Sequence, residues 1–152
     1  MNPVETLIAR AGAWRGSNTL HDPVTGQPEE SPSTLVVTPV LGGRFVRLDS
    51  TWSHQGTPQE GSLLIGFDPK SGAVSGHWVD SWHMGRLVLA CRGVGSPDGV
   101  IALRGSFAAP PGPEWGWRID VAAVGEGLKV LHTCIDPDEA ETVAAECLYQ
   151  RA

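Results

Sequence analysis

Four side chains of one short segment could form the wall of a ligand pocket. They are Trp78, Asp80, Trp82 and Met84. In a β-strand, side chains at every second position share a face, so this face would carry two indole rings, a carboxylate and a thioether. Binding pockets combine large apolar side chains with a few polar groups that orient the ligand. The spacing therefore predicts a pocket wall with Asp80 as its polar anchor.

A second interpretation of Asp80 is structural. A carboxylate in a protein interior needs a positive or hydrogen-bonding partner in order to stay charged. Arg47, Arg104 and Arg118 are candidate partners. Asp80 is then either the ligand anchor or half of a buried ion pair that fixes the strand register, and the residues alone leave both open.

His132 is a candidate haem ligand or polar anchor. It alternates with Val130 and Cys134, so it is expected on an apolar face. The alternative is a core histidine whose hydrogen bonds are satisfied within the protein, because one imidazole without partners carries little specificity for haem. Trp52 and Trp117 are expected mainly to pack in the core, where they can also line the pocket.

The segment around Asp80 offers little catalytic or metal-binding chemistry. In a straight strand His77 and His83 lie about 20 Å apart, so they cannot share one ion. Ser81 shares a side with His83 but not with Asp80, which leaves no triad. The chain has no nucleophile elbow, no metalloprotease helix motif, no phosphate-binding loop and no dinucleotide fingerprint. We therefore expect a protein that is not an enzyme, with no metal and no cofactor other than the haem alternative.

The composition of the chain indicates which classes of binding partner to expect. The formal net charge of −6 and a pI near 5.2 argue against nucleic acid. The sequence shows no leader segment and no apolar run of the roughly 20 residues that a spanning helix needs, so we expect a soluble, cytoplasmic protein without a membrane partner.

The three cysteines, Cys91, Cys134 and Cys147, are odd in number and lack metal or redox spacing, which predicts free, mostly buried thiols.

A short helix opens the chain. Asn2 can cap it, Pro3 fits its first position and Glu5 suits a capping box, while Gly12 can end it. One apolar stripe on a single helix must pack against a larger structure, so we expect this helix to close one end of a barrel.

The rest of the chain alternates apolar runs with Gly and Pro, which predicts about ten strands. Ten strands without further helices avoid exposed edges by closing into an antiparallel up-and-down barrel, and residues 1–152 suit one such domain. Two long loops, His21–Ser33 and Ala108–Glu114, would form its rim or lid. The expected strands are Trp14–Leu20, Leu35–Val40, Arg44–Trp52, Leu63–Phe67, Ala73–Trp82, Arg86–Gly93, Val100–Phe107, Trp117–Val124, Leu128–Ile135 and Thr142–Arg151.

Five motifs in order, GAWRG at 12–16, LGGRFV at 41–46, GFD at 66–68, WVDS at 78–81 and YQR at 149–151, resemble an uncharacterised, mostly bacterial family of calycin-like barrels. The resemblance implies a mainly β barrel of lipocalin or fatty-acid-binding-protein type, in which Trp14 and Arg151 close the bottom. Nitrobindin, a haem-binding barrel, is similar in shape, and only His132 occupies a loosely comparable place to its haem ligand.

We expect a barrel that holds a small apolar or amphipathic molecule. The alternatives are a haem-binding barrel that uses His132, and a structural or interaction module with a filled interior that forms a homodimer. The predicted ligand-binding residues are Trp52, Trp78, Asp80, Trp82, Met84, Trp117 and His132.

Overall fold

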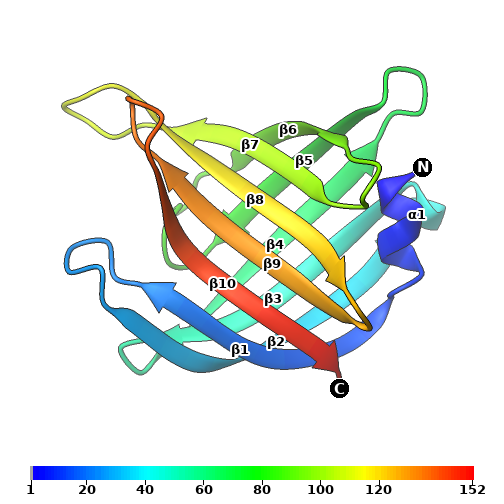
Figure 1. Cartoon of the computed structure of the whole chain (residues 1–152), viewed down its shortest axis with the longest axis horizontal. Coiled ribbons are helices and arrows are strands. Elements are labelled where there is room, and N and C mark those ends of the chain that lie inside the picture. The colour runs from blue at the N-terminus through cyan, green and yellow to red at the C-terminus, as the bar shows by residue number, and fades with distance from the viewer. Residues whose placement is uncertain (1) are drawn as a thin grey trace.

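The computed structural model describes residues 2–152 and confirms a mainly β fold in which ten antiparallel strands form a closed barrel (Figure 1). Each strand pairs with its neighbours in sequence, and β1 pairs with β10 to close the sheet. The strands are β1 (Gly12–His21), β2 (Pro28–Val40), β3 (Phe45–His54), β4 (Thr57–Phe67), β5 (Ala73–Asp80), β6 (Leu89–Gly95), β7 (Ile101–Phe107), β8 (Trp115–Val124), β9 (Gly127–Ile135) and β10 (Glu141–Arg151), and a 3-10 turn, η1 (Leu41–Gly43), joins β2 to β3.

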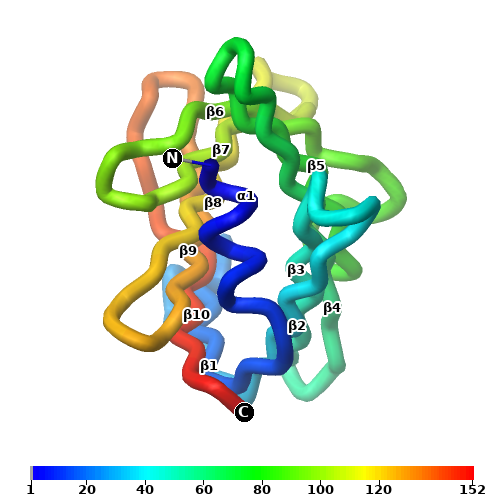
Figure 2. The backbone as a smooth tube through the Cα atoms, turned by 90° about the vertical axis from the view of Figure 1, so that its right-hand side faces the viewer, coloured from blue at the N-terminus to red at the C-terminus, as the bar shows by residue number. Residues whose placement is uncertain are grey.

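The helix α1 (Pro3–Ile8) covers one end of the barrel (Figure 2). As predicted, Asn2 caps it, and the Asn2 Oδ1 atom accepts hydrogen bonds from the Val4 and Glu5 amides over 2.9 and 3.4 Å. Val4 and Leu7 are buried in the barrel core. The helix stops at Ile8, before the predicted end at Gly12, and the opposite end of the barrel is the one that lacks a helix.

The first and last strands meet beneath the helix. The guanidinium of Arg151 lies 4.3 Å from the centroid of the buried Trp14 ring, and Arg151 Nη1 donates to the Ala11 carbonyl over 2.7 Å. The indole Nε1–H of Trp14 donates to the Arg10 carbonyl over 2.9 Å. The predicted structural pairing of Trp14 with Arg151 is therefore confirmed.

We expect the substitution Arg151→Met to lower the free energy of unfolding by about 1 kcal/mol, because it removes the cation–π contact and one hydrogen bond while keeping an apolar stem. Urea denaturation measures the change. Arg15→Met, on the exposed face of β1, is the matched control and should leave stability unchanged. Equal effects of the two substitutions would contradict the role assigned to Arg151.

The predicted loop His21–Ser33 is wrong, because only residues 22–27 lie outside the strands. β2 begins at Pro28 and pairs with β1 from Pro28 to Val37, whereas its pairing with β3 starts at Thr34. Prolines are tolerated in the first half of β2, which has only one paired edge. The inward positions there carry Ser31 and Ser33, both buried, so the apolar alternation that marks a strand is missing from the sequence.

Candidate functional site

An aromatic cluster fills the barrel end that faces away from α1. The Trp52 and Trp78 rings stack with their centroids 6.4 Å apart and an interplanar angle of 19°. The centroids of the Trp78 and His132 rings are 4.8 Å apart. Other contacts extend the cluster through Trp117 and His83. The complete set is Trp52, His54, Trp78, Trp82, His83, Phe107, Trp117 and His132.

A small cavity lies within this cluster and continues toward the barrel centre. The space open to the centres of water-sized molecules is about 40 Å³, enough for roughly three waters. Side chains therefore fill most of the interior. The cavity is lined by Asn18, Leu20, Leu35, Leu48, Ser50, Trp52, Leu63, Trp78, Asp80, Trp82, Trp117, Val130, His132, Ala145, Cys147 and Tyr149.

Gly61 on β4 sets the position of one wall of the cavity. A Cβ atom at residue 61 would lie 2.2 Å from Cη2 of Trp78, so the missing side chain is what lets the indole lie across the neighbouring strand. Ser50, Gly61 and Asp80 form a row across β3, β4 and β5 in register. Ser50 and Asp80 are half-buried, so at this row the wall of the cavity reaches the surface.

Asp80 is held by N–H donors and not by an arginine. Its Oδ1 atom accepts from the amides of Trp82, His83 and Met84, with the first at 2.9 Å and the last at 3.0 Å, while Oδ2 accepts from the Trp78 indole over 2.6 Å. Four N–H groups aimed at two oxygens fit a carboxylate, which only accepts.

The candidate ion pair of Asp80 with Arg47, Arg104 or Arg118 is wrong. Arg47 pairs with Asp49 over 2.8 Å and Arg104 with Glu139 over 2.9 Å. Arg118 pairs with Asp120 and with Glu141. These three arginines lie on strand positions of the outward face, whereas Asp80 lies on the inward face, so strand alternation separates them.

The strand that carries Trp78 ends at Asp80, earlier than predicted. Trp82 and Met84 therefore do not continue its alternation, because the chain turns around the Asp80 carboxylate. Trp82 still lines the cavity. Met84 is buried in the core but does not border the cavity, so the four-residue strand face from Trp78 to Met84 is corrected to Trp78 and Asp80 followed by a loop.

His132 lies on β9 with its ring in the cavity wall, 7% exposed. The Trp117 indole donates to His132 Nδ1 over 3.0 Å, which makes Nδ1 the acceptor and places the proton of the neutral ring on Nε2. Burial lowers the pKa of His132 to about 4, against the opposing attraction of Asp80. Among the described residues, no hydrogen bond reaches Nε2.

His83 joins the site although the sequence pointed away from it. Its ring stacks on Trp117 at 4.5 Å and 19° and meets Phe107 edge-on at 4.7 Å. Burial lowers its pKa. A straight strand would place His83 opposite Asp80, but the chain turns after Asp80, and no local spacing in the sequence signals the turn that brings His83 inward.

Two further polar groups of the cavity wall lack partners within residues 2–152. The Trp52 Nε1–H group is buried and has no hydrogen-bond acceptor. The Asn18 Oδ1 atom is buried too and has no hydrogen-bond donor. Asn18 Nδ2 donates to Cys147 Sγ over 3.0 Å. If the amide is turned over, Nδ2 is the atom without a partner, so one polar atom of Asn18 is unpaired in either orientation. The sequence did not mark Asn18 as a site residue.

The family model described as "Protein of unknown function (DUF1579)" matches residues 2–151. The chain belongs to this family. The resemblance noted from the five motifs is thereby confirmed at the level of the family and of the barrel.

Two solved structures are similar to this DUF1579 chain to different degrees. Rv2717c from M. tuberculosis has a TM-score of 0.71 at 17% identity, covering 99% of this chain and 97% of that chain. At this identity the likeness shows the fold alone. A proposed thioesterase II from Thermobifida fusca YX covers 100% of this chain and 86% of that chain at 11% identity, but its TM-score of 0.24 supports no argument. No curated protein matches the sequence.

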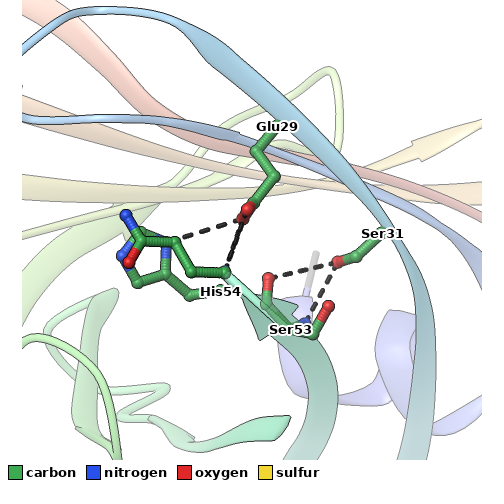
Figure 3. Close-up of polar contacts among 5 residues, drawn as sticks. Glu29, Ser31, Ser53 and His54 are labelled. Atoms are coloured by element: carbon green, nitrogen blue, oxygen red, sulfur yellow. Dashed lines mark hydrogen bonds and ion pairs between the residues drawn. The ribbon is translucent and has the colours of Figure 1, made fainter. Parts of the chain in front are cut away.

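The rim of the DUF1579 barrel between β2 and β3 is joined by side chains (Figure 3). Ser31 Oγ accepts from the Ser53 amide over 3.1 Å, and the Glu29 carboxylate accepts from the Gln55 amide over 2.9 Å. His54 Nδ1 lies 3.5 Å from Glu29 Oε2, close enough for an ion pair but without hydrogen-bond geometry. These links replace strand pairing beside Trp52, where the strands separate at the rim.

The described part of this DUF1579 chain contains neither a Ser–His pair at Ser81 nor a cluster of metal-ligating side chains. Ser81 Oγ bonds to Gln59 and to the Glu60 backbone, so it forms no pair with His83. Within residues 2–152 no three His, Cys, Asp or Glu side chains gather as a metal site, and no helix is long and apolar enough to cross a membrane. The three cysteines are free, with Cys91 and Cys147 buried.

Proposed function

We propose that this barrel binds a compact small molecule in the cavity at the end opposite α1. The observation that carries the proposal is that two residues of the cavity wall, Trp52 and Asn18, each have a buried polar atom without a hydrogen-bond partner among the described residues, while His132 Nε2 in the same wall takes part in no hydrogen bond there. A buried polar group without a partner costs about 1–3 kcal/mol, and a bound hydroxyl or carbonyl would remove that cost.

The volume supports a ligand of few atoms. Space for roughly three waters suits the small hydroxyl-bearing or carbonyl-bearing end of an amphipathic molecule, whose larger remainder lies toward the half-buried row at Ser50 and Asp80. A porphyrin exceeds that space many times, so haem would need the aromatic cluster to move apart. The filled interior favours the structural barrel as the second candidate, and the cytoplasmic location expected from the sequence stays a prediction.

Native mass spectrometry of gently purified protein, with an absorbance spectrum of the same sample, provides the first test. A retained small molecule supports the proposal and gives its mass.

A second test titrates 3,3-dimethylbutan-1-ol while the indole N–H signals are followed by NMR. We expect saturable shifts for Trp52 and Trp117, and none for Trp14 beneath the helix or for Trp115, which lies outside the cavity lining.

The substitution Trp52→Phe keeps an aromatic ring and removes the unpaired donor. We expect it to weaken binding of the alcohol about five-fold, in line with one lost hydrogen bond of about 1 kcal/mol. Trp115→Phe is the matched control and should not alter the affinity. A bare chain mass together with no saturable shift of the cavity indoles would refute the proposal and leave the filled, structural barrel.

A further inference from the structure

The cavity wall carries an unbalanced negative charge. Asp80 is the only formally charged side chain among its lining residues, and none of those within the described chain is Lys or Arg. His132, the remaining titratable group of basic character in the wall, is neutral above acidic pH because burial lowers its pKa to about 4. The four N–H donors around Asp80 solvate its charge but bring no formal positive charge.

Asp80 also has one oxygen, Oδ2, that is only partly occupied by hydrogen bonds. Its Oδ1 atom accepts three hydrogen bonds, whereas Oδ2 accepts one from Trp78, and a carboxylate has about four acceptor sites in all, about two on each oxygen. The bonds are therefore unevenly placed. A cationic group needs no N–H to lie against Oδ2, where its positive charge would balance that of the carboxylate.

The remaining walls suit a positive charge better than a negative one. Trp52, Trp78, Trp82 and Trp117 all border the cavity. The face of an indole ring is electron-rich, tryptophan is the strongest side-chain partner of a cation, and aromatic cages with this composition hold methylated ammonium groups. An anion would meet these faces and the Asp80 carboxylate together, which disfavours anionic ligands in the same site.

The loops at the cavity end of the barrel also carry more negative than positive charge. The connections 22–27, 55–56, 81–88, 108–114 and 136–140 lie at this end because antiparallel strands alternate their direction. They contain five acidic residues and one basic residue, Asp22, Glu114, Asp136, Asp138 and Glu139 against Arg86, and because Glu139 is paired with Arg104 of β7, an excess of three negative charges remains. With a net charge of −6 on the whole chain, the local potential should attract cations and repel anions.

We propose that the ligand of this cavity is a small organic cation, a methylated ammonium group joined to a hydroxyl-bearing tail; this rests on the function proposed above. The ammonium head lies among the indole rings near Asp80, and the hydroxyl oxygen accepts from Trp52 Nε1 or His132 Nε2. A metal ion does not fit the same role, because no set of three ligating side chains surrounds Asp80 in residues 2–152.

Two isosteric probes separate charge from shape. Choline carries a trimethylammonium head, and 3,3-dimethylbutan-1-ol is its neutral counterpart with carbon in place of nitrogen. Isothermal titration and the indole N–H signals measure both affinities at one ionic strength. We expect choline to bind at least ten-fold more tightly than the alcohol, and added salt to weaken choline more than the alcohol.

Two substitutions test the origin of that preference. Asp80→Asn keeps an oxygen for the three backbone amides and removes the charge, so the choline preference should fall to within about three-fold. Trp82→Leu leaves the Asp80 hydrogen bonds in place and removes one indole, so it should weaken choline more than the alcohol. The second variant keeps the test valid if the first is poorly folded.

The outcomes distinguish this inference from the proposed function. If both probes bind with equal affinity, or the alcohol binds more tightly, the cavity is a binding site and the cationic class is wrong. If neither probe shifts the indole signals, the cationic class is wrong, and if the purified protein also has a bare chain mass, the proposed function fails with it. A choline preference that persists in Asp80→Asn would overturn the role of the carboxylate.

Discussion

Acidification from about pH 7 to about pH 4 is expected to lower the free energy of unfolding by about 3 kcal/mol through His132 alone. Burial lowers the pKa of His132 to about 4 in the folded protein, against 6.5 for an unperturbed histidine. Below pH 6.5 the unfolded chain takes up a proton that the folded protein excludes, so stability falls as the pH falls. The loss accumulates between the two pKa values and stops near pH 4.

The substitution His132→Gln isolates this contribution. Glutamine offers an acceptor to the Trp117 indole and does not titrate. The free energy of unfolding of the variant should therefore fall much less steeply than that of the wild type between pH 6.5 and pH 4. Some slope remains, because burial shifts the pKa of His83 in the same direction. His77→Gln, at an exposed position, is the control and should follow the wild type. Urea denaturation across this pH range provides the data, and parallel curves for wild type and His132→Gln would contradict the buried neutral ring.

The barrel could be predicted from sequence because most inward positions are apolar and most turns contain Gly or Pro. The alternation Leu103, Gly105, Phe107 on β7 and Trp117, Ile119, Val121 on β8 shows this pattern. The prediction failed where polar residues face inward, as with Ser31 and Ser33 in β2. Their hydrogen bonds to Ser53 and Tyr149 satisfy them inside the barrel, and partners so distant in sequence cannot be read from local spacing.

The site was only partly predictable for a related reason. Trp78 and Asp80 were correctly assigned to the inward face, since they lie within one regular strand. His83 and Met84 were misplaced because the carboxylate of Asp80 accepts from three successive amides and turns the chain out of the strand. That turn depends on how one side chain is used. A strand-period argument cannot represent it, and the same limit hid the aromatic stacking of His83.

Removal of the Asp80 side chain should have the second large effect. We expect Asp80→Ala to lower the free energy of unfolding by about 3 kcal/mol or more, because four N–H groups lose their acceptor and bonds to a charged group are worth about 1.5–3 kcal/mol each. Partial exposure of the loop lets water satisfy some of these donors, so the total stays well below the sum. A loss of this size needs no ion pair, and stability alone therefore does not distinguish an anchor from a buried salt bridge.

Two matched substitutions show whether the hydrogen bonds or the charge produce the loss. Asp80→Asn retains an acceptor for the three backbone amides and should cost about 1–2 kcal/mol, mainly from the Trp78 indole that loses its partner. Asp49→Ala removes a surface carboxylate paired with Arg47 and should cost about 1 kcal/mol or less. Amide hydrogen exchange of Trp82, His83 and Met84 provides the local readout. If Asp80→Ala leaves these three amides as protected as in the wild type, the carboxylate does not hold the loop, and the geometry of the cavity wall must depend on the packing of Trp82 and Met84 instead.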